Sequence, residues 1–317
     1  MTISELISDN QQTAFSFEVL PPLKGNGTAS LFRTIDTLKE FNPRYINITT
    51  HRSEFVYHPQ ADGSFTRSSI RRRPGTIAVA SAIMQKYDVK VVPHVVCSGF
   101  TQEDIEYMLL DLQFLGIEDL LLLRGDKAKD ESQFKPVPGG YSHTTELIEQ
   151  VVRFNNGEFM DGSPIKHPGI PFSFGVACYP EKHEEAPNLD FDLKMLKRKQ
   201  DMGADYAVTQ MFFDNSKYFR FVERARQEGI TIPIIPAVKP IAKLSQFTVV
   251  PKTFHLDLPE ALSKEMERCT TDEQIKQVGV EWGIQQCREL IAHGVPSIHF
   301  YTVSAVDSIR QIAEAIF

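Results

Sequence analysis

The sequence contains only four cysteines, and none of them forms a CxxC pair. So few cysteines do not make a disulfide framework, and their spacing gives no sign of a zinc site. The sequence also lacks an HExxH motif and any Cys/His cluster. Its first residues show no basic segment followed by an apolar stretch, which is the pattern of a secretory signal. We therefore expect a cytoplasmic protein without a metal centre.

Long apolar runs and an excess of positive charge are also missing. No segment approaches the roughly 18 consecutive apolar residues that a membrane-spanning helix needs. The 34 Lys and Arg residues are outnumbered by 41 Asp and Glu residues, which gives a formal net charge of −7. That sign opposes binding to a phosphate backbone. We expect neither a membrane nor a nucleic acid as a partner.

Two common nucleotide-binding motifs are absent as well. The sequence has no GxGxxG following an expected strand, and no GxxxxGK[ST]. Neither a dinucleotide-binding Rossmann fingerprint nor a phosphate-binding P-loop is therefore expected.

The 317 residues, of which 42% are hydrophobic, instead show short β-branched and aromatic runs alternating with segments of helical periodicity. This alternation is typical of βα units around a parallel sheet. The expected strands are residues 15–20, 44–50, 89–96, 119–126, 171–180, 205–213, 231–238 and 297–303. Eight such units without a linker predict an α/β protein, a single (β/α)₈ TIM barrel over residues 1–317. The segment from Pro251 to His293 predicts an extra helix before the last strand.

Local signals place helix starts and loops in this scheme. Thr101 followed by Asp104 predicts a capping box at a helix start. Residues 51–75 follow the second strand, so we expect them as a loop at the carboxyl ends of the strands. Residues 155–170 precede the fifth strand and belong at the opposite end.

Polar residues recur near the carboxyl ends of strands that should otherwise be apolar. They share one face of a strand at Ser16 and Glu18, Asn47 and Thr49, Arg124 and Asp126, and His299 and Tyr301. His94, Tyr179 and Gln210 add a polar group on three more strands. Because barrel enzymes build their active sites at this end, the layout predicts an enzyme.

Each of these residues also has a structural interpretation. Asp126 can cap a helix or pair with Arg124, and His94 can be a hydrogen-bonded core histidine. Gln210 can satisfy a strand carbonyl. A glutamate inside a strand is rarely buried without a purpose, so for Glu18 we favour function over a structural ion pair.

Nine segments together resemble the methylenetetrahydrofolate reductase family. They occur in the family's order and span nearly the whole chain: FSFEVLPP from Phe15, INITTH from Ile46, VVPHVVC from Val91, LLLRGD from Leu121, CYPEKHEEA from Cys178, DLKMLKRKQDMGAD from Asp192, TQMFFD from Thr209, IIPAVKPI from Ile234 and HFYTV from His299. FSFEVLPP and YPEKHEEA are the most specific of them.

The resemblance implies a barrel that holds noncovalent FAD without a Rossmann motif. It implies that NADH or NADPH first reduces the flavin, after which 5,10-methylenetetrahydrofolate is reduced to 5-methyltetrahydrofolate. No acidic or basic residue can be assigned to the nucleotide ribose, so the sequence does not distinguish NADH from NADPH. The resemblance also implies a homo-oligomer. Because the sequence ends with the barrel, we expect no inhibition by adenosylmethionine through a regulatory domain.

The resemblance assigns roles to individual residues. Glu18 resembles the general acid that protonates N10 of the folate, and Asp126 the carboxylate near flavin and pterin. Gln210, Gln246 and Tyr301 are implied as substrate-binding residues. The implied FAD-binding residues are Thr49, His94, Arg124, Gly125, Asp126, Tyr141, Tyr179, His183, Asp192, Arg198 and Lys199. The segment from Lys127 to Gly140 is then a candidate lid.

Two positions depart from the family's pattern. Ala305 stands where bacterial relatives have an arginine, and Val250 where a relative has a phenylalanine that stacks on the ligand. One hypothesis is that the basic segment from Arg67 to Arg73, which includes Arg71-Arg72-Arg73, binds the glutamate tail of the folate. The alternative is that those arginines only form part of a solvated loop.

Other functions fit the polar strand ends too. A cofactor-free barrel lyase would use Lys239 to form a Schiff base, and a hydrolase would use Glu18 with Asp126. A catalytically silent ligand-binding barrel is the third alternative.

Overall fold

The computed structural model describes residues 1–8, 12–128, 131–303 and 305–317. They divide into two compact units. Unit 1 comprises Met1–Val19, Arg33–Asn47 and Ser173–Phe317, and unit 2 comprises Leu20–Phe32 and Ile48–Phe172.

The elements alternate along the chain as the sequence predicts. The strands are β1 (Ala14–Val19), β2 (Tyr45–Ile48), β3 (Glu54–Pro59), β4 (Phe65–Ile70), β5 (Lys90–Val96), β6 (Asp119–Leu123), β7 (Ser173–Cys178), β8 (Tyr206–Thr209), β9 (Ile234–Ile235), β10 (Ala237–Val238) and β11 (Ser297–Tyr301). The helices are α1 (Ile3–Ser8), α2 (Ala29–Leu38), the short 3₁₀ helix η1 (Lys39–Phe41), α3 (Thr76–Lys86), α4 (Gln102–Phe114), α5 (Thr144–Asn155), α6 (Leu189–Asp201), α7 (Asn215–Gln227), α8 (Leu244–Phe254), α9 (Glu260–Glu267), α10 (Asp272–Ala292) and α11 (Val306–Ile316).

Nine of the strands form one sheet in the order β10-β11-β1-β2-β5-β6-β7-β8-β9. Its two outer members, β9 and β10, are halves of one expected strand separated by Pro236. Proline has no N–H to donate, so it interrupts a sheet ladder. β9 pairs in parallel with β8, and β10 pairs in parallel with β11. Because β9 and β10 follow each other in the chain, the two ends of the strand order meet. The predicted (β/α)₈ barrel class is confirmed.

The helices bury the faces that the periodicity predicts. In α4, Ile105, Met108, Leu109 and Leu112 are buried. The capping box is also confirmed, because the Thr101 side chain accepts from the Asp104 N–H while the Asp104 carboxylate accepts from the Thr101 N–H. Each contact satisfies an amide that the first helical turn would otherwise leave unpaired.

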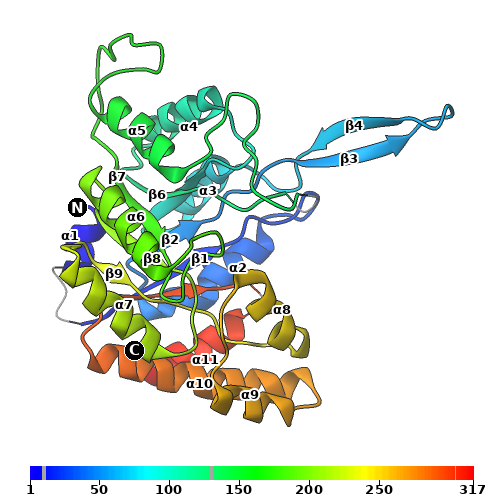
Figure 1. Ribbon diagram of the computed structural model, residues 1–317, viewed down its shortest axis with the longest axis vertical. Coiled ribbons are helices and arrows are strands. Elements are labelled where there is room, and N and C mark those ends of the chain that lie inside the picture. The colour runs from blue at the N-terminus through cyan, green and yellow to red at the C-terminus, as the bar shows by residue number, and fades with distance from the viewer. Residues whose placement is uncertain (9–11, 129–130, 304) are drawn as a thin grey trace. The chain divides into compact units, whose positions relative to one another are not determined.

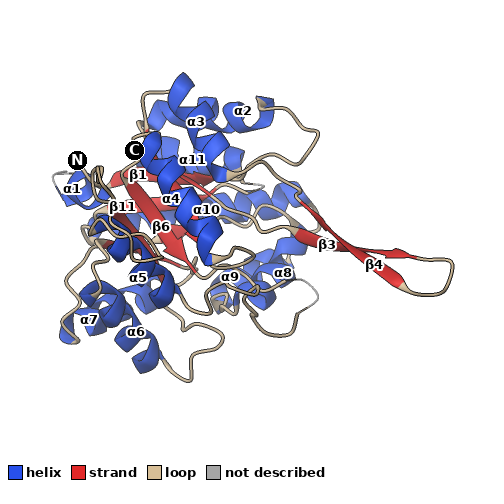
Figure 2. Cartoon of the chain, turned by 90° about the horizontal axis from the view of Figure 1, so that it is seen from above, coloured by secondary structure: helices blue, strands red, loops and turns tan. Residues whose placement is uncertain are grey.

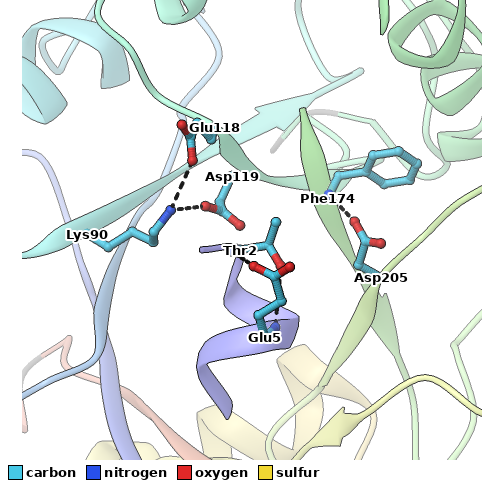
Figure 3. Close-up of polar contacts among 7 residues, drawn as sticks. All are labelled: Thr2, Glu5, Lys90, Glu118, Asp119, Phe174 and Asp205. Carbon is cyan, nitrogen blue, oxygen red and sulfur yellow. Dashed lines mark hydrogen bonds and ion pairs between the residues drawn. The ribbon is translucent and has the colours of Figure 1, made fainter. Parts of the chain in front are cut away.

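Charged residues at the amino ends of strands make structural contacts in both units (Figure 3). In unit 2, the Lys90 ammonium lies 2.5 Å from the buried carboxylate of Asp119 and 3.7 Å from that of Glu118. In unit 1, the Phe174 N–H donates to Asp205 Oδ2 at 3.0 Å. Polar groups at this end of barrel strands contribute to stability rather than to catalysis.

The expected extra helical segment is confirmed by three helices, α8, α9 and α10, between β10 and β11. Helix α10 supports the segment that follows β8, since Trp282 Nε1 donates to Phe213 O at 3.0 Å and Gln286 Nε2 donates to Phe212 O at 2.8 Å. A Cβ atom at Gly279 would collide with the backbone oxygen of Ile241. Glycine therefore allows α10 to lie directly against the chain that follows β10.

The expectation of a plain loop over residues 51–75 was wrong. β3 and β4 form an antiparallel hairpin whose pairs run from Glu54 with Ile70 to Pro59 with Phe65. Figures 1 and 2 show the hairpin extending away from the other elements of unit 2. Most of its residues are exposed, so it lacks the buried face that makes a strand recognisable from hydrophobic alternation.

Candidate active site

Glu18 is the penultimate residue of β1 and is only 9% exposed. It pairs with Tyr301 of the neighbouring strand β11, and the Thr302 hydroxyl donates to the Glu18 backbone oxygen at 2.7 Å. Burial raises the pKa of Glu18 to about 8, an effect that the nearby Lys239 ammonium partly opposes. The carboxyl is therefore protonated at neutral pH, which is what a proton donor requires.

Lys239 follows β10 and is 8% exposed. Its Nζ donates to the backbone oxygen of Val303 at 2.6 Å. Burial lowers the pKa of Lys239 to about 8, while the charge of Glu18 acts in the opposite direction. A buried acid and a buried base of unit 1 thus influence each other's pKa.

Tyr301 connects this region with β8. Its hydroxyl donates to the backbone oxygen of Thr209 at 2.9 Å. Burial and the adjacent Glu18 carboxylate hold the pKa of Tyr301 well above its usual range. The phenol therefore remains a neutral donor.

Gln210 follows β8, where its backbone N–H donates to Cys178 O at 2.8 Å. Its side-chain oxygen accepts from the N–H of the next residue, Met211, at 2.9 Å. This contact resembles the structural interpretation of Gln210. The side chain satisfies a backbone group, but the group is an N–H donor rather than the expected carbonyl.

The residues after β7 form a second cluster in unit 1. The rings of Tyr179 and His183 meet edge to face with centroids 4.7 Å apart, and the His183 N–H donates to Asp192 Oδ2 at 2.8 Å. Burial raises the pKa of Asp192. Lys199 Nζ donates to Ala177 O at 3.3 Å, whereas Arg198 is exposed. The structure thus brings four of the five implied residues of this region to the end of β7.

Two glutamates of the YPEKHEEA motif have a role that sequence reasoning missed. Glu181 Oε2 lies 2.7 Å from Lys217 Nζ and accepts from the Asp257 N–H at 2.9 Å. Glu184 pairs with His255 at 2.5 Å. These contacts fasten the loop after β7 to α7 and to the end of α8. In the sequence these contacts are indicated only by the acidic motif itself, because the partners of the two glutamates lie more than 30 residues further along the chain.

The other positions of unit 1 that the sequence singled out make contacts within the protein. The Gln246 side-chain oxygen accepts from the Ala242 N–H at 2.8 Å, which ties the first turn of α8 to the chain that precedes the helix. Val250 is buried in an apolar cluster with Met211 and Phe213. Ala305 is buried at the start of α11.

In unit 2, His94 lies on β5 and is 5% exposed. Its backbone oxygen accepts from the Thr50 hydroxyl at 2.5 Å, and Thr49 Oγ1 lies 3.2 Å from His51 Nε2. Burial, followed by the charge of His51, lowers the pKa of His94 to about 3. Its Nε2 is buried without a hydrogen-bond partner among the described residues. A buried ring nitrogen in this state is available for a hydrogen bond with a bound molecule, as donor or acceptor according to the tautomer.

The segment after β6 is held by Ser98. The Ser98 N–H donates to Arg124 O at 2.9 Å, and its hydroxyl donates to Asp126 O at 2.6 Å. Gly125 has φ +78°, and a Cβ there would lie 2.8 Å from the Ser98 Cβ. A glycine therefore fits this turn, whereas a side chain would be strained. The Asp126 side chain is exposed.

Arg124 and Tyr141 complete the implied residues of unit 2. The Arg124 guanidinium lies 4.8 Å from the centre of the Phe134 ring, a cation–π contact. Burial raises the pKa of Tyr141 to about 12. Within the candidate lid from Lys127 to Gly140, residues 129–130 lie outside the described part of the chain.

The described residues include neither a metal-binding cluster nor a membrane-spanning helix. No group of three or more His, Cys, Asp or Glu side chains there could hold a metal ion. No helix in this part of the chain is long and apolar enough to cross a membrane.

The match to a known family extends over nearly the whole chain. Residues 2–316 match the family model described as methylenetetrahydrofolate reductase. The chain belongs to this family. The resemblance inferred from the nine segments is confirmed.

Individual relatives extend the match. The chain is 30% identical over 303 residues to "Methylenetetrahydrofolate reductase (NADH) 1" of Arabidopsis thaliana, covering 94% of this chain but 47% of that protein. It is 27% identical over 310 residues to the 5,10-methylenetetrahydrofolate reductase of Salmonella typhimurium, covering 96% and 91%. The chain thus spans about half the length of the plant relative and most of the bacterial one.

Solved structures agree on the fold. An uncharacterised protein from Clostridium thermocellum that binds two copies of 5-methyl-5,6,7,8-tetrahydrofolic acid aligns with a TM-score of 0.58 at 13% identity, covering 99% of this chain and 97% of that one. An F420-dependent secondary alcohol dehydrogenase aligns with a TM-score of 0.55 at 12% identity, covering 97% and 100%. At such low identity these matches concern the fold alone.

Proposed function

We propose that the protein reduces 5,10-methylenetetrahydrofolate to 5-methyltetrahydrofolate, using NADH or NADPH through noncovalent FAD. Membership of the family supports this reaction class. The observation that carries the proposal is Glu18, a buried carboxyl whose pKa of about 8 keeps it protonated where such an enzyme needs an acid.

In this proposal Glu18 donates its proton to N10 of the folate. Protonation of N10 lets the bond between N10 and the methylene carbon break, and the bonding electrons stay on N10. The N5 lone pair then forms the 5-iminium cation that accepts a hydride. The Thr302 hydroxyl fixes the Glu18 backbone during this step, because it holds the Glu18 carbonyl at 2.7 Å.

The residues present fit an FAD molecule. His94 Nε2, which has no partner among the described residues, can accept a hydrogen bond from a ligand. When bound, FAD supplies hydride transfer between the nicotinamide and the folate. We propose as FAD-binding residues Thr49, His94, Arg124, Gly125, Asp126, Tyr141, Tyr179, His183, Asp192, Arg198 and Lys199.

For the substrate we propose Asp126, Gln210, Gln246 and Tyr301 as contacts. The Gln210 oxygen accepts from Met211 and the Gln246 oxygen from Ala242, so each side chain has its NH₂ group to offer to a ligand. We further propose that residues 1–317 act as one catalytic domain in a cytoplasmic homo-oligomer.

The Glu18→Gln variant tests the proposal. The purified wild type should show flavin absorption that bleaches with NADH or NADPH in a stopped-flow instrument. Glu18→Gln should keep this bleaching but lose at least about 100-fold in the rate at which methylenetetrahydrofolate reoxidises the reduced protein. In the wild type this second rate should fall as the pH rises through about 8, because the Glu18 carboxyl then loses its proton.

The exposed Glu260 provides a matched control, and Glu260→Gln should behave like the wild type in both half-reactions. If Glu18→Gln slows both half-reactions equally, Glu18 is not the acid. A folded, colourless protein would instead favour the cofactor-free lyase or hydrolase.

A further inference from the structure

Lys239 lies level with Glu18 across three adjacent strands of unit 1. Glu18 pairs with Tyr301, and Val238 pairs with Phe300. The next residue, Lys239, therefore lies beside Tyr301 on the side opposite to Glu18. Side chains level with one another in parallel strands point to the same face of the sheet. Glu18 and Lys239 thus flank one tyrosine on one face.

The surroundings of Lys239 explain why it acts on this carboxyl. Its Nζ donates at 2.6 Å to the oxygen of Val303, which lies two residues beyond β11, the strand that separates Lys239 from Glu18. Burying an ammonium is costly unless an opposite charge offsets the lost hydration. The mutual influence of Lys239 and Glu18 on their pKa values shows that each is within electrostatic reach of the other.

The other titratable groups that act on this pair or on Tyr301 are phenols and a thiol. From β11, Tyr301 faces Glu18 with a phenol whose pKa is raised well above its usual range. From the end of β7, Tyr179 and Cys178 act on Tyr301, and burial raises the pKa of the Cys178 thiol. Lys239 is thus the charge that acts on Glu18 among the described residues of unit 1.

We propose that Lys239 is a positioning residue that stabilises the carboxylate left on Glu18 after proton donation, an assignment that rests on the proposed function. The O–H bond of Glu18 breaks as the N10–H bond forms, which leaves a negative charge in a buried place. Lys239 keeps its own proton and offsets that charge. Without Lys239, Glu18 would be a weaker acid and would remain protonated to higher pH.

The test is a pH titration of the Glu18 carboxyl by difference infrared spectroscopy, with the signal assigned by its loss in Glu18→Gln. Lys239→Met should move the midpoint upward by about one pH unit or more, as expected when an opposite charge is removed from a buried acid. Lys239→Arg, which keeps the charge, should restore a midpoint near that of the wild type. The control Lys243→Met removes an exposed ammonium four residues away and should leave the midpoint unchanged.

The kinetic readout is the folate half-reaction at neutral pH, which should slow about tenfold in Lys239→Met while flavin reduction stays as in the wild type. A Glu18 midpoint that does not move in folded Lys239→Met overturns the proposal. This result differs from failure of the proposed function, which would appear as an unimpaired folate half-reaction in Glu18→Gln.

If Lys239→Met does not fold, Glu18→Gln measures the same coupling from the other side. Loss of the carboxylate should lower the midpoint of Lys239, followed by NMR of its Cε, by as much as the lysine lowers that of Glu18. An unchanged Lys239 midpoint in Glu18→Gln would equally overturn the proposal.

Discussion

The hydroxyl of Tyr301 donates a hydrogen bond to the backbone oxygen of Thr209 at 2.9 Å. The contact connects the end of β11 with the end of β8, and Gln210 is the residue that follows. Because this proton is already committed to Thr209, the proposed contact of Tyr301 with a folate would use the ring and the oxygen lone pairs rather than the hydroxyl proton.

Tyr301→Phe should therefore lower the free energy of unfolding by about 1–3 kcal/mol, because it leaves the Thr209 oxygen buried without a donor. Urea unfolding measures the change. The ring stays in place, so flavin reduction should be unaffected and the folate KM should rise only modestly. Tyr57→Phe removes an exposed hydroxyl from the hairpin and should leave the stability unchanged. A Tyr301→Phe variant as stable as the wild type would show that this hydrogen bond contributes nothing.

Much of the barrel could be predicted from the sequence, because strands buried on both faces and helices with one apolar stripe leave clear patterns. The burial of Glu18 followed from the same reasoning: a carboxyl between Phe17 and Val19 in a barrel strand has little access to water. The raised pKa of Glu18 is the physical consequence of that burial.

What could not be predicted depends on contacts between distant segments. Glu181 and Lys217 are 36 residues apart, and only the fold brings them within 2.7 Å. Lys239 and Glu18 are far apart in the chain, but the sheet places β10 and β1 on the two sides of the same strand, β11. Only this arrangement brings the charge of Lys239 within reach of Glu18. The hairpin was missed for a different reason, since exposed strands leave no hydrophobic alternation.

The histidine His94 should make the fold sensitive to acid. Its pKa is lowered to about 3 by burial and by His51, so the unfolded chain binds a proton below about pH 6.5 that the folded protein does not bind. Stability present above that pH is therefore lost as the pH falls toward 3, by up to about 1.4 kcal/mol per pH unit. Urea unfolding of the wild type and of His94→Gln at pH 7 and pH 5 measures this.

Between these two pH values the wild type should lose about 2 kcal/mol more than His94→Gln. His58→Gln, which replaces an exposed histidine of the hairpin, should keep the pH dependence of the wild type. Equal losses in the wild type and in His94→Gln would contradict a neutral, buried His94.

The arginines between Arg67 and Arg73 divide into two kinds. Arg72 pairs with Glu54 at 3.0 Å, and Arg73 donates to the backbone oxygen of Pro21, so both hold the base of the hairpin. Arg67 lies over the ring of Phe55, and Arg71 is exposed. The hypothesis that this segment binds the glutamate tail of the folate is therefore best tested at Arg67 and Arg71.

Replacing both arginines by glutamine should raise the folate KM about two- to 30-fold at low salt, since each of the two exposed charge pairs contributes about 0.2–1 kcal/mol. Flavin content and flavin reduction should stay as in the wild type. The increase should be larger for a folate with several glutamates and should shrink as salt screens the charges. Arg220→Gln combined with Arg268→Gln removes two exposed charges from helical parts of unit 1 as the control. An unchanged folate KM in the hairpin variant would remove the hypothesis, because its charges would then not reach the substrate.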